Sequence, residues 1–200
     1  MTQSFSCRIA RRLLAAFGWS LVVEPPSSPK AVIVFYPHTS NWDFFIGITA
    51  KSAVALDIHW AGKDSLFSWP LATLSKSFGG IPVKRGQRAN QVAQLAAEFG
   101  KRESFYLAIA PEGTRRRTDA WKSGFYRLAL AARVPVGLAF IDYPRREIGI
   151  MGYLTLCGDE ASDFANIRKA YAGRIGKYPH QQGPICLHPA PAASNNRNTA

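Results

Sequence analysis

The chain is poor in cysteine and in acidic residues, and it lacks an apolar run long enough to cross a membrane as a helix. Its 3 cysteines are Cys7, Cys157 and Cys186. Their odd number and wide spacing argue against a disulfide framework and favour a reducing compartment. The apolar run from Leu13 to Val23 is interrupted by a glycine and a serine. It is shorter than the roughly 20 residues that a membrane-spanning helix needs.

The signature motifs of several enzyme classes are also absent. The sequence contains neither a Gly-x-x-x-x-Gly-Lys-Ser/Thr nor a Gly-x-Gly-x-x-Gly phosphate loop, so nucleotide chemistry is not expected. It has no Gly-x-Ser-x-Gly elbow, which a serine hydrolase of the α/β type would show. One histidine and one aspartate are too few ligands for a metal site. We therefore expect neither a metal ion nor a cofactor.

The charge is strongly unbalanced. There are 25 Lys and Arg residues against 13 Asp and Glu residues, which gives a formal net charge of +12. This excess of basic residues implies an acidic partner surface, either anionic phospholipid or nucleic acid. The run from Arg115 to Arg117 could contact nucleic acid, but no recognised binding motif accompanies it. An anionic membrane is therefore the favoured partner, and no nucleic acid is expected.

The first residues, 1–24, combine apolar and basic side chains near helical spacing. The apolar positions are Phe5, Ile9, Leu13, Leu14, Phe17 and Trp19, and the basic positions are Arg8, Arg11 and Arg12. This pattern predicts an amphipathic helix at a membrane interface. A signal peptide is disfavoured because the apolar run is short and no small-residue cleavage site follows it. A helix that packs on its own domain remains an alternative.

The remaining sequence alternates predicted strands and helices after a linker at 25–29. The expected strands are 31–36, 56–60, 80–84, 104–110, 134–141 and 147–156, and the expected helices are 41–55, 66–77, 90–99, 121–133 and 159–177. The alternation predicts a single α/β domain over residues 31–179, with a largely parallel central sheet covered by helices on both faces. One or two antiparallel strands are expected near its end. Residues 180–200, rich in Gln, Pro, Ala and Asn, predict a disordered tail.

A histidine and an aspartate stand five residues apart after the first predicted strand. Five residues of an ideal helix turn through about 140°, so His38 and Asp43 can meet only if His38 lies in a loop and Asp43 in the first turn beyond it. The carboxylate would then fix the imidazole tautomer, and the other ring nitrogen could take a proton from a hydroxyl attacking an acyl carbonyl. The competing interpretation is a capping box of Ser40 and Asp43 beside a solvated histidine.

Three further segments fall at comparable places in the chain. The segment 79–85 enters a short strand through two glycines and leaves it through Lys84 and Arg85, which suits a phosphate. The segment 111–115, Pro-Glu-Gly-Thr-Arg, follows an apolar strand and offers a carboxylate, a glycine backbone and a guanidinium. The segment 134–137, Val-Pro-Val-Gly, opens another strand. The carboxyl ends of strands are where open α/β sheets gather ligands.

Taken in order, these four segments resemble the glycerolipid acyltransferase family, which includes 1-acyl-glycerol-3-phosphate acyltransferases. The resemblance covers residues 31–140. It implies that His38 is the general base and Asp43 its partner, and that Arg85, Glu112 and Arg115 hold the phosphoglycerol head of the acceptor. The implied substrate-binding set is completed by Gly113, Thr114 and Lys63.

The resemblance also implies the reaction. A fatty acyl group would pass from a thioester of acyl carrier protein or coenzyme A to the free hydroxyl of a lysolipid, with 1-acyl-glycerol-3-phosphate as the favoured acceptor and phosphatidic acid as the product. Two alternatives stay open: another acceptor such as lyso-ornithine lipid, and a non-catalytic basic module that binds anionic membranes or nucleic acid. We expect a peripheral location on the cytoplasmic side of the inner membrane.

Overall fold

The computed structural model describes residues 5–54, 56–70, 72–83 and 88–187. Its strands are β1 Ser20–Val23, β2 Lys30–Tyr36, β3 Ile58–Lys63, β4 Gly80–Val83, β5 Phe105–Ile109, β6 Val136–Asp142 and β7 Glu147–Leu154. Its helices are α1 Phe5–Ala16, α2 Trp42–Ala53, α3 Ala72–Ser77, α4 Arg88–Lys101, α5 Gly124–Ala132 and α6 Glu160–Ala170, with the short 3-10 helices η1 Asp64–Phe67 and η2 Pro179–Gln181.

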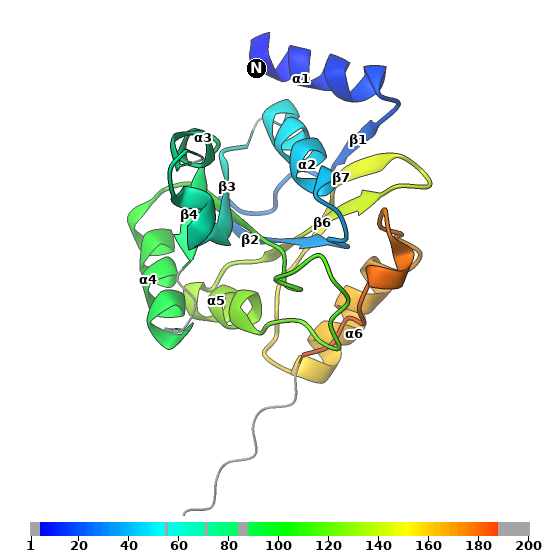
Figure 1. The fold of residues 1–200 in the computed structure, drawn as a ribbon. Coiled ribbons are helices and arrows are strands. Elements are labelled where there is room, and N and C mark those ends of the chain that lie inside the picture. The colour runs from blue at the N-terminus through cyan, green and yellow to red at the C-terminus, as the bar shows by residue number, and fades with distance from the viewer. Residues whose placement is uncertain (1–4, 55, 71, 84–87, 188–200) are drawn as a thin grey trace, which may run out of the picture.

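The strands form one sheet in the order β1-β7-β6-β2-β5-β3-β4 (Figure 1). All neighbouring strands pair in parallel except β6 and β7, which are antiparallel. The predicted fold class, a largely parallel sheet with reversed strands toward its end, is confirmed. Strand β2 pairs with both β5 and β6, so the loops that follow these three strands lie at the same edge.

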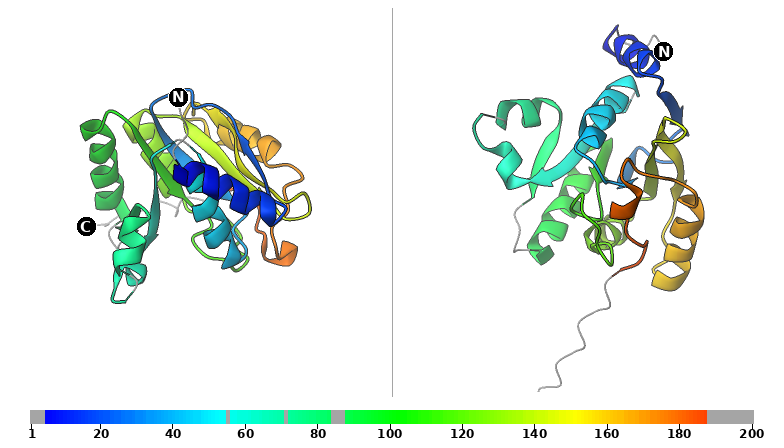
Figure 2. Two further views of the ribbon diagram at one scale, coloured as in Figure 1. Left: turned by 90° about the horizontal axis from the view of Figure 1, so that it is seen from above. Right: turned by 45° about the vertical axis from the view of Figure 1, so that its right-hand side comes forward.

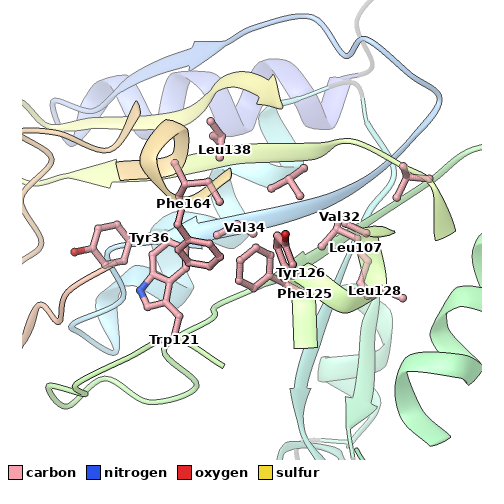
Figure 3. Packing of buried hydrophobic residues seen from close by; sticks show 14 of the residues in the cluster. Val32, Val34, Tyr36, Leu107, Trp121, Phe125, Tyr126, Leu128, Leu138 and Phe164 are labelled. Carbon is pink, nitrogen blue, oxygen red and sulfur yellow. The ribbon is translucent and has the colours of Figure 1, made fainter. Parts of the chain in front are cut away.

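Both faces of the sheet are covered by packed side chains. Successive side chains of a strand point to opposite faces, so each strand contributes residues to both layers. Val32 and Val34 of β2 join a cluster with Trp121, Phe125 and Phe164, on the side of α5 and α6 (Figure 3). A smaller cluster on the other face unites residues of α1 and α2 with β6 and β7. Figures 1 and 2 show α1 beside α2, across the sheet from α4, α5 and α6. The sheet is therefore buried on both sides, as parallel sheets usually are.

The N-terminal segment differs from the single helix expected over residues 1–24. Helix α1 ends at Ala16, and Gly18 adopts a φ of 73° while the N–H of Trp19 donates to the carbonyl of Leu14. This is the glycine-assisted end that many helices use. The segment Ser20–Val23, which ends in two β-branched valines, then forms β1, which pairs in parallel with β7. The segment is thus part of the sheet as well as a helix.

Two other expected helices are shorter in the structure. The one expected over 66–77 is divided into η1 and α3, because Pro70 has no N–H to donate and disfavours helix at the preceding residue. The one expected over 159–177 ends at Ala170, shortly before Gly173 adopts a φ of 75°. The chain beyond α6 is then free to run back to the edge of the sheet where β2 ends.

Residues 180–187, which were expected to belong to a disordered tail, are placed in the structure. The hydroxyl of Tyr36 donates to the carbonyl of Gly183 at 2.9 Å, and the N–H of Trp121 donates to the carbonyl of Cys186 at 2.7 Å. This segment is therefore held to the domain by hydrogen bonds to its backbone carbonyls. Amino-acid composition, on which the prediction of disorder was based, does not reveal such bonds. The rest of the predicted tail, residues 188–200, lies outside the described residues.

Candidate active site

His38 and Asp43 meet at the end of β2. His38 lies in the loop after this strand, and Asp43 lies in the first turn of α2. Nδ1 of the imidazole is 3.1 Å from Oδ2 of the carboxylate, and the side chains are 18% and 0% exposed. The loop and helix placement expected from their spacing is thus the one observed. The pairing leaves Nε2 of His38 as the nitrogen that can accept a proton.

Both oxygens of the Asp43 carboxylate accept hydrogen bonds. Oδ2 also accepts the backbone N–H groups of Thr39 and Ser40, each at 2.8 Å, and Oδ1 accepts the hydroxyl of Tyr143 at 2.7 Å. A buried carboxylate needs such donors to remain charged. The N–H of Trp42 donates to Oγ of Ser40. Asp43 therefore accepts N–H groups of the loop that leads into α2 and contacts the imidazole at the same time, so His38 is not the merely solvated histidine of the competing interpretation.

Glu112 lies beneath the His38 loop. It follows β5, the neighbour of β2, and its Oε2 accepts the backbone N–H of His38 at 2.7 Å. The residue is only 1% exposed. Burial, with a smaller contribution from the nearby Asp43 carboxylate, raises the pKa of Glu112 to about 7. The structure places this carboxyl against the histidine loop, and its expected role in holding the acceptor head group stays a prediction.

The turn after Glu112 brings a cation to the same edge of the sheet. Gly113 adopts a φ of 65°, and a Cβ atom there would collide with the side chain of Lys122. The positive φ favours glycine at this position, and the flexible end of the Lys122 side chain would have to move to admit a Cβ atom. Thr114 accepts the N–H of Arg116 through its hydroxyl, and Arg115 is exposed. The guanidinium of Arg115 is thus accessible to a ligand.

Two predicted substrate-binding residues cannot be placed as side chains. Lys63 ends β3, which pairs with β5 and β4, and only its backbone is described. Arg85 lies outside the described residues. Their roles remain predictions.

The loop that follows α6 contacts the histidine loop, which the sequence did not indicate. The N–H of Tyr178 donates to Oγ1 of Thr39 at 3.2 Å, and a Cβ atom at Gly176 would collide with the same threonine side chain. Nζ of Lys177 lies 5.1 Å from the ring centroid of Trp42. This arrangement adds a cation and two exposed aromatic residues beside the pair of His38 and Asp43.

Tyr143 is the other contact that sequence reasoning missed. It follows β6, and a residue after a parallel strand that neighbours β2 belongs at the ligand-gathering edge. That rule was the available signal. Among the described residues, no group of three or more His, Cys, Asp or Glu side chains is arranged to hold a metal ion.

Comparisons with known proteins identify the family and a similar fold. Residues 22–138 match the family described as Acyltransferase. The fold is similar to the crystal structure of the 1-acyl-sn-glycerophosphate acyltransferase PlsC from Thermotoga maritima, with a TM-score of 0.53 and 16% sequence identity. The match covers 86% of this chain and 80% of that one. No curated protein matches the sequence significantly.

Proposed function

The chain belongs to the acyltransferase family, and we propose that it moves a fatty acyl group from an acyl thioester to the free hydroxyl of 1-acyl-glycerol-3-phosphate. The observation that carries the proposal is the 3.1 Å contact between Nδ1 of His38 and the buried Asp43 carboxylate. A base oriented in this way can activate a hydroxyl, which acyl transfer to an alcohol requires.

In the proposed reaction, Nε2 of His38 takes the proton as the acceptor oxygen attacks the thioester carbonyl. A C–O ester bond forms, the C–S bond breaks, and the imidazolium returns the proton to the departing thiolate. Asp43 stabilises the transient positive charge of the imidazolium. Because the thioester is already activated, holding both substrates in place and removing the proton suffice, without a covalent enzyme intermediate.

The proposed acceptor carries a phosphate, and three features support this choice. The chain has a formal net charge of +12. Arg115 is exposed on the turn that follows Glu112, whose carboxyl touches the His38 loop. The similar protein from Thermotoga maritima is named for 1-acyl-sn-glycerophosphate. We assign Arg115 and Arg85 to the phosphate, with Lys63 and the backbone around Gly113 and Thr114 lining the acceptor site.

The test is a panel of lysolipids offered with acyl-acyl carrier protein and with acyl-coenzyme A, followed by mass spectrometry of the lipid formed. Phosphatidic acid from 1-acyl-glycerol-3-phosphate, absent with the His38→Ala variant, is the expected result. Preferential acylation of lyso-ornithine lipid would keep the chemistry and replace the acceptor. No acylated product from any acceptor, together with vesicle or nucleic-acid binding, would favour the non-catalytic alternative.

We further propose that the protein is a peripheral protein of the cytoplasmic side of the inner membrane. Helix α1 turns Cys7, Ala10 and Leu14 inward, while its opposite side exposes Phe5 and Ile9 at 71% and 49%. Leu13 and Phe17 continue this exposed row, and Arg8 and Arg12 are exposed beside it. Apolar side chains next to basic ones suit the interface of an anionic membrane. Among the helices of the described segments, none has the length and apolarity to span a bilayer.

A further inference from the structure

Among the described residues, Tyr143 is the one that donates a hydrogen bond to Oδ1 of Asp43. It begins the turn between β6 and β7, 100 residues from Asp43 in the chain, and its hydroxyl donates at 2.7 Å. The donors to the other oxygen, Oδ2, come from His38, Thr39 and Ser40, all on the loop that leads into α2. Within the part of the chain that the structure describes, Tyr143 is the residue that ties the carboxylate to a different part of the fold.

Resting on the proposed function above, we propose that Tyr143 is a positioning residue that fixes the plane of the Asp43 carboxylate and so aims the imidazole of His38 at the acceptor hydroxyl. Rotation about the Cβ–Cγ bond moves both carboxylate oxygens, so the donors on Oδ2 already restrain the carboxylate from the side of its own loop. The donor on Oδ1 adds a restraint from the opposite side and from a different part of the fold, which narrows the orientations that remain. Catalytic geometry is sensitive to shifts of about 1 Å, so a residue that touches no substrate can still control the rate.

The Tyr143 hydroxyl is suited to act as a permanent donor. Burial, followed by its hydrogen bond with Asp43 and the charge of that carboxylate, raises the pKa of Tyr143 well above its ordinary value. The phenol therefore keeps its proton throughout the range in which a histidine base works. A charge-assisted bond of 2.7 Å between a hydroxyl and a carboxylate is of the stronger kind.

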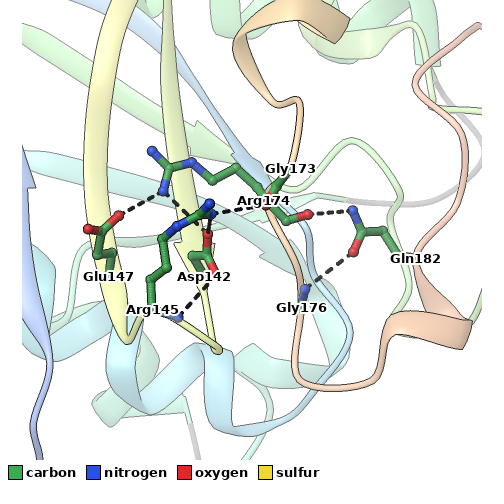
Figure 4. Close-up of polar contacts among 7 residues, drawn as sticks. All are labelled: Asp142, Arg145, Glu147, Gly173, Arg174, Gly176 and Gln182. Carbon is green, nitrogen blue, oxygen red and sulfur yellow. Dashed lines mark hydrogen bonds and ion pairs between the residues drawn. The ribbon is translucent and has the colours of Figure 1, made fainter.

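The turn that carries Tyr143 is held by ion pairs (Figure 4). Asp142, whose side chain is fully buried, lies 2.7 Å from Arg145 and 3.4 Å from Arg174. Arg174 also pairs with Glu147 at 2.8 Å, so the two ends of the turn share one guanidinium. These contacts join the β6–β7 turn to the loop after α6.

Tyr143 itself is held at its backbone and at its ring. Its N–H donates to the carbonyl of Ile175 at 3.0 Å, on the loop after α6. Trp19 packs edge-on against its ring, with 5.1 Å between centroids. The next residue, Ser20, donates its N–H to the carbonyl of Arg146 in the same turn. The segment between α1 and β1 therefore buttresses the tyrosine that holds Asp43.

A second tyrosine and aspartate pair provides a matched control. The hydroxyl of Tyr126 on α5 donates to Oδ2 of Asp163 at 2.9 Å, in a buried setting. Asp163 also accepts the backbone N–H groups of Cys157 and Gly158, just as Asp43 accepts two backbone N–H groups. Helix α5 covers the opposite face of the sheet from α2, so this pair is structural and separate from His38.

The experiment compares wild type, Tyr143→Phe and Tyr126→Phe in thermal melts and in steady-state acyl transfer. We expect Tyr143→Phe to lower kcat by roughly 10-fold to 100-fold, the effect of losing one hydrogen bond to a charged group, with the acceptor KM within about twofold. Tyr126→Phe should lower Tm at least as much and leave kcat unchanged. Equal kcat losses in the two variants, or none in Tyr143→Phe, would overturn the proposal.

A spectroscopic readout separates this proposal from the proposed function. In ¹⁵N-labelled protein without substrate, the His38 ring should show a protonated Nδ1 in wild type and in Tyr126→Phe, and a shifted or broadened Nδ1 signal in Tyr143→Phe. An unchanged His38 signal in Tyr143→Phe refutes the positioning role whether or not the enzyme is active. If the His38 signal changes in Tyr143→Phe while the wild-type protein forms no lipid product, the positioning role holds and the proposed function fails.

Discussion

At the scale of single residues, the candidate site depends on one short loop that follows β2, carries the proposed base and is supported by residues that follow two neighbouring strands. His38 follows β2, Glu112 follows β5 and supports the His38 backbone, and Tyr143 follows β6 and supports Asp43. Each side chain has a distinct physical task, so single substitutions should have separable effects on rate, stability and substrate binding.

Replacing the proposed base should abolish turnover without unfolding the protein. We expect His38→Ala to lower kcat by roughly 10² to 10⁴-fold, the usual contribution of general-base catalysis. Asp43→Asn should be nearly as severe, because an amide no longer selects the productive tautomer. Steady-state kinetics and thermal melts would test this. Full activity in a folded His38→Ala protein, or a stability loss of about 1 kcal/mol with normal activity in Asp43→Asn, would leave only the capping role.

The buried carboxyl of Glu112 should make stability depend on pH. Its pKa is raised to about 7 from 4.5, so its stabilising effect is complete below about pH 4.5 and is lost as pH rises through about 7. Wild type should therefore lose up to about 3 kcal/mol of unfolding free energy from this group between pH 5 and pH 8. Glu112→Gln keeps an acceptor for the His38 N–H and should lose less. Urea unfolding at both pH values would decide, and parallel pH dependence in the two proteins would contradict the prediction.

The proposed phosphate contacts should affect one substrate more than the other. We expect Arg115→Ala and Arg85→Ala to raise the acceptor KM about 10-fold or more, because each removes a charge-assisted contact of roughly 1.5 to 3 kcal/mol. The thioester KM should change little. Arg116→Ala is the matched control, since Arg116 is exposed on the same turn. Equal increases in both KM values would argue against a phosphate site here.

At the scale of elements, α1 has one buried face and one exposed face. Leu14 is 4% exposed and belongs to the cluster shared with α2, whereas Phe5 and Phe17 are 71% and 69% exposed. The two interpretations of this segment, a membrane-interface helix and a helix packed on its own domain, can therefore both hold. Deleting the segment would also remove β1 from the sheet, so point substitutions separate the roles better than truncation.

Substitutions on the exposed face of α1 should weaken vesicle binding alone. We expect the double change Phe5→Ser and Phe17→Ser to reduce binding to anionic vesicles without lowering Tm, because these side chains lose no internal packing. Leu14→Ala should show the reverse, with a stability loss of about 2 to 5 kcal/mol, as in other buried leucines. Vesicle sedimentation and thermal melts provide both readings. Unchanged sedimentation of the double variant would remove the membrane role of this face.

At the scale of the whole molecule, the net charge of +12 should govern how binding responds to salt. Basic groups near an anionic leaflet contribute about 1 kcal/mol each and are screened within roughly 10 Å at 0.1 M salt. We expect binding to anionic vesicles to fall steeply between low and physiological salt, and neutral vesicles to bind weakly throughout. Co-sedimentation across a salt series would test this, and equal binding to neutral and anionic vesicles would exclude an electrostatic role.

The sequence by itself determined the α/β class and the position of most strands, and it allowed His38 and Asp43 to meet in one arrangement, which the structure shows. These depend on local signals: apolar periodicity, turn residues and a five-residue spacing that permits a single geometry. Family resemblance supplied the expected chemistry, and the 22–138 match agrees with it.

Only the tertiary structure decided which distant residues surround that pair. Tyr143 is separated from Asp43 by 100 residues, and nothing in its neighbourhood of the sequence marks it, because its contact follows from the pairing of β6 with β2. In the same way, the pairing of β5 with β2 brings Glu112 within hydrogen-bond distance of the His38 backbone. The Tyr36 hydroxyl donates to the backbone carbonyl of Gly183 and so holds this segment against the domain, a contact that amino-acid composition cannot predict. Sheet register, which joins segments far apart in the chain, is what sequence periodicity cannot supply.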